Sequence, residues 1–130
     1  MTAAGERFAR AVAAKDPVAL AATMADGIDF QALTPGRHWQ AYSPREVAEE
    51  TVLRYWFGPG ADITGLAKLT TGAVGGRQHV AYQLQVTRDG REYLVEQQAY
   101  YDTEGDQISW MRVLCAGYQP APAPAAATVR

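Results

Sequence analysis

The stretch QHVAYQLQVTRDGREYLVEQQAYYDTEGDQISWMRVLCAG, residues 78–117, decides the fold because it contains three strand-like segments joined by short turns. Asp89-Gly90 and Glu104-Gly105 separate these segments, and such dipeptides favour tight hairpins between antiparallel strands. Gly75-Gly76 marks a third hairpin turn, which joins residues 63–74 to the same stretch. The C-terminal half is therefore predicted to form an antiparallel meander of four strands.

Alternation within the meander predicts which side chains face the interior, because successive residues of a strand point to opposite faces of a sheet. The more apolar set within residues 93–101 consists of Tyr93, Val95, Gln97, Ala99 and Tyr101. The corresponding set in the preceding strand consists of Val80, Tyr82, Leu84 and Val86. Both sets are predicted to point inward.

The last strand is ambiguous, because two alternating sets compete for the interior. One set is Ile108, Trp110, Arg112 and Leu114, and the other is Met111, Val113 and Cys115. If Ile108 packs inside, Arg112 also points inward, and it then needs a partner because an unpaired internal charge costs roughly several kcal/mol. Asp29 and Glu96 are the candidate partners. The alternative is that Arg112 faces solvent.

Two short helices are predicted at the N-terminus. Phe8 and Val12 place apolar side chains on one face of the first, which ends near Lys15. Asp16 is a good N-cap and Pro17 suits the first helical position, so a second helix is predicted over about 17–25.

A strand and a third helix are predicted to follow. Ile28, Phe30 and Ala32 alternate with polar residues, which predicts a strand over 28–33 that stops at Pro35-Gly36. Ser43-Pro44-Arg45-Glu46 is a capping box that starts the third helix, and Gly58-Pro59-Gly60 ends it. Residues 35–42 are predicted to be a loop.

Composition limits the classes of function. The chain has 130 residues, 48% of them hydrophobic, and a formal net charge of -2, which suits one domain without a basic stripe for nucleic acid. No apolar run approaches the ~20 residues that a membrane span needs, so we expect a cytoplasmic protein with no membrane partner. The single cysteine, Cys115, and two histidines predict neither an intrachain disulfide nor a zinc site, and Cys115 is predicted to be an inert buried thiol.

The domain is predicted to span residues 1–118. Residues 119–130, QPAPAPAAATVR, alternate proline and alanine and contain no bulky apolar residue until Val129. Such a composition is typical of a tail or linker.

Three passages carry a resemblance to a known family: KDPVALAATMADGIDF (15–30), LTPGRHWQA (33–41) and YYDTEGDQISWMRV (100–113). With the order of elements, they make the chain similar to the NTF2-like superfamily and to its SnoaL-like small proteins. The resemblance implies an α+β cone, a curved and mostly antiparallel sheet wrapped around three N-terminal helices, with a pocket at the wide end. It also implies isomerase, cyclase, hydrolase or dehydratase chemistry, or ligand binding alone.

The resemblance places the connection after the first strand at the pocket rim. Trp39 is then expected to close over a ligand and His38 to act as an acid or base, beside Arg112 and an aromatic of the third helix. The alternatives are that Trp39 covers the core and that His38 is solvated. Arg112 would anchor an anionic or carbonyl group with Asp29 as a neighbouring base, or the two would form a closed structural pair.

The predicted site therefore has two groups of residues and no metal. The catalytic candidates are His38, Asp29 and Arg112. The ligand-binding candidates are Trp39, Tyr55, Trp56, Tyr82, Gln97, Tyr101 and Trp110. For the three tyrosines the alternative is core packing with the hydroxyl satisfied elsewhere.

The predicted function is binding of a small, largely apolar, polyketide- or terpenoid-like molecule in the cone. If the protein is an enzyme, we expect acid/base isomerisation, cyclisation or dehydration without a cofactor. The alternative is a non-catalytic ligand-binding or accessory protein. A homodimer is expected to form through the sheet face that the helices leave uncovered.

Overall fold

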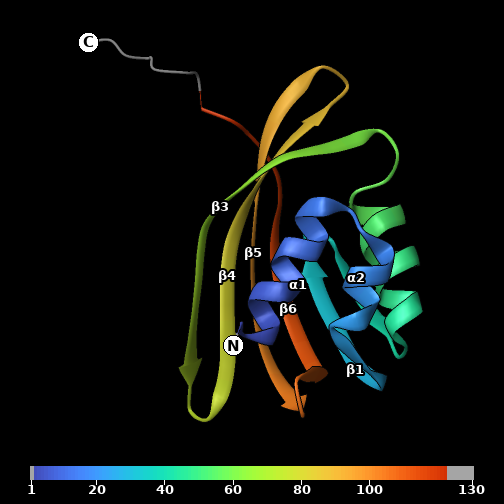
Figure 1. Ribbon diagram of the computed structural model, residues 1–130. Helices are drawn as coiled ribbons and strands as arrows, with labels where there is room; N and C mark the ends of the chain where they lie inside the picture. Colours follow the sequence, from blue (N-terminus) through green and yellow to red (C-terminus); the bar gives the residue numbers. More distant parts are fainter. Residues whose placement is uncertain (1, 123–130) are drawn as a thin grey trace.

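Six strands form one curved, open sheet with all three helices on one of its faces (Figure 1). The structure is a computed structural model that describes residues 2–122. Its elements are α1 (Ala4–Ala14), α2 (Pro17–Ala22), β1 (Met24–Thr34), β2 (Arg37–Ala41), the π-helix η1 (Glu46–Trp56), β3 (Ala61–Val74), β4 (Arg77–Arg88), β5 (Arg91–Glu104) and β6 (Gln107–Pro120). Among these, no helix is long and apolar enough to cross a membrane.

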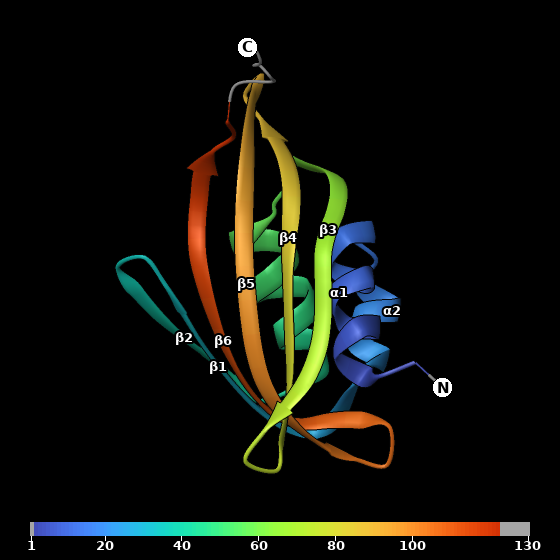
Figure 2. The same cartoon turned by 90° about the vertical axis from the view of Figure 1, so that its left-hand side faces the viewer.

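The strand order is β2-β1-β6-β5-β4-β3, and only the β1–β6 pair is parallel. Figure 2 shows the sheet from the side opposite the helices, which we name the outer face; the helix-covered side is the inner face. The expected α+β cone is confirmed by this arrangement. The largest fully buried side chains, such as Phe8, Phe30 and Tyr101, lie between the helices and the inner face.

The predicted meander is confirmed as β3 to β6. At the β4–β5 turn, Asp89 has φ 53° and Gly90 has φ 75°, the left-handed values that a two-residue hairpin turn requires. Strand β6 continues to Pro120, which pairs with Tyr93, so the domain extends two residues past the predicted boundary at 118. Most of the predicted tail, residues 123–130, lies outside the described residues.

The two N-terminal helices also form as predicted, although α2 is shorter. The Asp16 side chain accepts hydrogen bonds from the backbone N–H groups of Val18 and Ala19, which caps α2. The helix ends at Ala22 instead of about residue 25. The reason is that Met24, which is buried, already belongs to β1.

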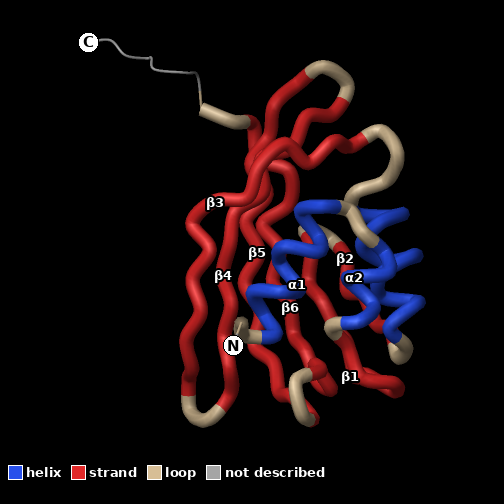
Figure 3. The backbone as a smooth tube through the Cα atoms, in the orientation of Figure 1, coloured by secondary structure: helices blue, strands red, loops and turns tan. Residues whose placement is uncertain are grey.

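The predicted loop at 35–42 is wrong for most of its length. Pro35-Gly36 forms a turn, and Arg37 to Ala41 form β2, an edge strand paired antiparallel with β1 (Figure 3). This pairing satisfies backbone groups that a loop would leave to water. It also fixes side-chain direction, because neighbouring residues of a strand point to opposite faces.

The capping box starts the third helix as predicted. The Glu46 N–H donates to Ser43 Oγ at 3.1 Å, and the Tyr42 N–H donates to Glu46 Oε1 at 3.0 Å. The helix is wider than an α-helix, since the Phe57 N–H donates to the carbonyl oxygen of Val52, five residues earlier, at 2.8 Å. Its last turn presents Tyr55 and Trp56 toward the first residues of β2.

Candidate functional site

The narrow part of the cone is filled by its own side chains. Tyr82, Gln97 and Tyr101 are each at most 2% exposed, so their predicted inward direction is confirmed. The Tyr82 hydroxyl donates to Gln97 Oε1 at 2.5 Å, and the Tyr101 hydroxyl accepts from the Gly5 N–H at 2.9 Å. Burial, with a smaller contribution from Cys115, raises the pKa of the Tyr82 phenol, which therefore stays a protonated donor.

A cavity of about 280 Å³ lies at the wide end of the cone, and we name it the wide-end cavity. Its volume is close to the lower limit of about 300 Å³ for small-molecule pockets. Strand β2 and the end of η1 supply one wall, formed by Trp39, Tyr55, Trp56 and Phe57. The ends of β1, β4, β5 and β6 supply the rest, with Thr34, Pro35, Arg88, Val95, Cys115, Gly117 and Tyr118.

Trp39 lines this cavity. Its ring centroid lies 5.5 Å from that of Tyr55 and 6.1 Å from that of Trp56. The Trp39 indole N–H donates to Thr34 Oγ1 at 2.8 Å, which holds the ring across the turn between β1 and β2. Three of the predicted ligand-binding residues therefore form one aromatic wall.

Two buried donors near the cavity lack a hydrogen-bond partner among the described residues, namely Trp56 Nε1 and Gln97 Nε2. Trp56 lines the cavity directly. Gln97 is the cross-strand neighbour of Cys115, which also lines it. A buried donor left unpaired costs about 1–3 kcal/mol, so both atoms would gain from an acceptor oxygen.

Two cavity residues, Arg88 and Tyr118, were not among the predicted site residues. Arg88 continues the alternation of Tyr82, Leu84 and Val86, so the pattern contained the signal for it. Tyr118 had no such signal, because β6 carries an irregularity between Cys115 and Tyr118, where Gly117 has φ 82°. Burial raises the pKa of the Tyr118 phenol, and the Arg88 guanidinium offsets part of that shift.

Arg112, whose direction the sequence left open, does not point into the cone. Ile108 is buried. In the pairing of β5 with β6, Thr103 pairs with Ile108 but Asp102 pairs with Trp110, so Ser109 is an extra residue in β6. A bulge of this kind reverses the alternation beyond it. Met111, Val113 and Cys115 therefore point inward, whereas Trp110 and Arg112 lie on the outer face.

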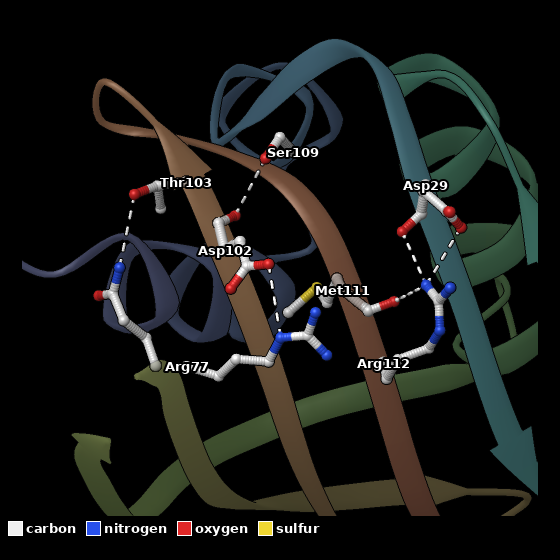
Figure 4. Close-up of polar contacts among 8 residues, drawn as sticks. Asp29, Arg77, Asp102, Thr103, Ser109, Met111 and Arg112 are labelled. Carbon is white, nitrogen blue, oxygen red and sulfur yellow. Dashed lines mark hydrogen bonds and ion pairs between the residues drawn. The ribbon is translucent and has the colours of Figure 1, made fainter. Parts of the chain in front are cut away.

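On the outer face, Arg112 forms the pair with Asp29 that the sequence predicted as one alternative. Arg112 Nη1 lies 3.1 Å from Asp29 Oδ1 and also donates to the backbone oxygens of Asp29 and Met111, each at 3.0 Å (Figure 4). The Trp110 ring lies 4.4 Å from the Arg112 guanidinium carbon and 3.7 Å from that of Arg77. Glu96, the other candidate partner, is exposed.

His38 lies on the outer face as well. Its Nε2 is 3.0 Å from Gln31 Oε1, and it shares a hollow of about 160 Å³ with Gln31 and Arg112. The three catalytic candidates, His38, Asp29 and Arg112, are therefore brought together. They lie on the opposite side of the sheet from the wide-end cavity, as does the ligand-binding candidate Trp110.

A second hollow lies away from the candidate residues. It is a groove of about 530 Å³ on the surface of α1 and α2, lined by residues between Thr2 and Thr23. In the described part of the chain, no cluster of three or more His, Cys, Asp or Glu side chains could hold a metal ion.

No protein-family model matches the sequence, and no curated protein is similar enough to it to count as a match. Solved structures do match. A LEH-like epoxide hydrolase from M. tuberculosis has a TM-score of 0.63 at 17% identity, over 86% of this chain and 79% of that one. A proposed polyketide cyclase from Xanthomonas campestris has a TM-score of 0.64 at 16% identity, over 84% of each chain.

An NTF2-like protein from Burkholderia thailandensis gives a TM-score of 0.64 at 18% identity, over 88% of this chain and 92% of that one. At such identities the likeness shows the fold alone. The chain has the NTF2-like fold that the sequence resemblance implied.

Proposed function

We propose that the protein binds a small, largely apolar molecule carrying an acceptor oxygen in the wide-end cavity, without catalysing a reaction on it. The observation that carries this proposal is the mainly aromatic wall of the cavity, formed by Trp39, Tyr55 and Trp56. The Trp56 indole N–H in this wall is buried and unpartnered among the described residues, and an oxygen of the ligand would accept from it once the side chain turns toward the cavity, which would offset the cost of about 1–3 kcal/mol of leaving it unpaired. The rings around it would contact the apolar body of the ligand.

The positions of the acid and base candidates favour ligand binding over catalysis. No Asp, Glu or His occurs among the described residues that line the cavity. Asp29 is paired with Arg112 and His38 contacts Gln31, all across the sheet from the ligand position. A general base must come within about 3.2 Å of the proton that it removes. The names of two structural neighbours mention epoxide hydrolase and polyketide cyclase activities. The geometry of this cavity supports neither activity here.

Replacing Trp39 with alanine is expected to weaken ligand binding by about tenfold or more, because a large ring that covers a ligand dominates its contact area. The probe is 6-propionyl-2-(dimethylamino)naphthalene, a neutral naphthyl ketone with an acceptor oxygen, whose emission shifts to shorter wavelength in apolar surroundings. Titration of wild type and variant gives the two dissociation constants.

Trp110→Ala is the matched control, since it removes the same side chain from the outer face. It should bind the dye like the wild type. Equal losses in both variants, or no binding by the wild type, would contradict a site in the wide-end cavity.

We also propose that two copies associate through the outer face. Leu33, Tyr100 and Leu114 are exposed apolar side chains on this face, and Leu33 is the register neighbour of Leu114. Light scattering should then give twice the chain mass of 14.1 kDa. Leu114→Glu should restore the single-chain mass, whereas Val18→Glu, an exposed position on α2, should not. A wild-type protein that scatters as a single chain would refute the dimer.

A further inference from the structure

Two guanidinium groups stand at the rim of the wide-end cavity, each stacked on an aromatic ring of its wall. The Arg88 guanidinium carbon lies 3.8 Å from the centroid of the Tyr118 ring, and Arg88 itself lines the cavity. On the opposite wall, the Arg37 guanidinium carbon lies 3.6 Å from the centroid of the Trp39 ring. Arg88 is half-buried and Arg37 is exposed.

Neither guanidinium has a carboxylate partner in the described part of the chain. The ion pairs found there occupy Arg10, Arg45, Arg77 and Arg112, all away from the cavity. The cavity lining contains no Asp or Glu among the described residues. This positive rim occurs on a chain whose formal net charge is -2, so it is a local feature and not a general property of the surface.

From this arrangement we infer that the ligand is a small apolar carboxylic acid whose carboxylate binds Arg88. The inference rests on the proposed function, because it assigns the chemistry of the molecule in the same cavity. A planar guanidinium offers parallel N–H donors that match the two oxygens of a carboxylate. Partial burial strengthens this charge-assisted contact, since the surroundings screen it less than water does.

Stacking prepares Arg88 for that role. The Arg88 guanidinium lies over the Tyr118 ring, and a planar guanidinium that stacks on a ring can still donate N–H groups from its edge. The Tyr118 hydroxyl donates to the carbonyl oxygen of Trp56 at 2.6 Å, which fixes the ring on which Arg88 rests. Less side-chain freedom is then lost when the carboxylate binds. Arg37 adds a second positive charge at the rim without lining the cavity.

Calorimetric titration with naphthoate and with its methyl ester tests the inference, because the two probes differ in charge but share the same rings. The wild type should bind the acid at least about tenfold more tightly than the ester. Arg88→Met keeps an apolar stem that can cover Tyr118 and removes the charge. It should weaken naphthoate binding by about tenfold or more and leave ester binding within about twofold.

Arg91→Met is the matched control, because Arg91 is exposed and pairs with Arg88 across the same hairpin. It removes one positive charge from the same region and should leave both affinities unchanged. Arg88→Lys should fall between wild type and Arg88→Met, since it keeps the charge without the planar donor pair. If Arg88→Met does not fold, the ratio of the wild-type affinities for naphthoate and for its methyl ester still tests the inference.

Two results would overturn the inference, and they differ in what they mean for the proposed function. Equal wild-type affinity for acid and ester would remove the carboxylate but keep an apolar binding cavity. Failure of the wild type to bind naphthoate, its methyl ester or the naphthyl ketone dye would remove both.

Discussion

Replacing Phe30 with alanine is expected to lower the free energy of unfolding by about 3–5 kcal/mol. Phe30 is fully buried on β1. It pairs with Ala41 of β2 on one side and with Met111 of β6 on the other. Its ring lies 6.2 Å from that of Trp56, so the cavity left by the truncation adjoins the aromatic wall. Because domains of this kind have only about 5–15 kcal/mol of stability, the variant should be close to unfolding at room temperature.

Denaturation in guanidinium chloride measures the difference, and Val74→Ala is the control. Val74 is 58% exposed at the end of β3 and is not among the residues of the proposed interface, so its truncation should change stability by no more than about 0.5 kcal/mol. A loss below about 1 kcal/mol for Phe30→Ala would mean that β1 does not present this face to the core.

The sequence predicted the inner face of β4 and β5 correctly because alternation there is uninterrupted. From Gln78 to Arg88 every residue of β4 pairs with one of β5 without a register shift. The apolar set therefore marks one face from end to end, and the buried polar residues Tyr82 and Gln97 follow the same phase. Extending the inward-facing set of β4 by two residues, from Val86 to Arg88, would also have placed Arg88 at the cavity.

The bulge in β6 could not be predicted in the same way. A bulge adds one residue to one strand only, and nothing in the side chain of Ser109 requires it. One extra residue is enough to reverse the direction of Trp110 and Arg112. The sequence thus offered the Asp29–Arg112 pair from charge and left its side of the sheet open, whereas the site hypothesis assumed the side of the cavity. This error moved the expected catalytic group away from the expected ligand.

Strand β2 was missed for a different reason. Arg37 to Ala41 contains two apolar residues among three polar ones and follows a Pro-Gly turn, a pattern that suits a loop as well as an edge strand. Its pairing with β1 comes from the tertiary structure. The consequence is functional, because a strand turns Trp39 inward and His38 outward, whereas a loop could have brought both to one ligand.

Gly5 and Tyr101 show how closely α1 approaches the sheet. The backbone N–H of Gly5, in the first turn of the helix, has no partner within the helix and donates to the Tyr101 hydroxyl at 2.9 Å. A Cβ added at Gly5 would lie 2.7 Å from Cε1 and from the hydroxyl oxygen of Tyr101. The Tyr101 ring is 1% exposed and has no free space into which it could move without disturbing the core.

Gly5→Ala is therefore expected to destabilise the protein, although alanine favours helices. The gain in helix propensity is at most about 1 kcal/mol, whereas overpacking a buried contact costs about 1–3 kcal/mol and strains the Gly5–Tyr101 hydrogen bond as well. Gly60→Ala is the control, since a Cβ there would meet no atom within 4 Å and should leave stability almost unchanged. In a Tyr101→Phe background the cost of Gly5→Ala should fall, because one of the clashing atoms is absent. Urea denaturation of the wild type, Gly5→Ala, Tyr101→Phe and the double variant measures this coupling. An unchanged or higher stability of Gly5→Ala would show that α1 lies farther from β5 than the structure places it.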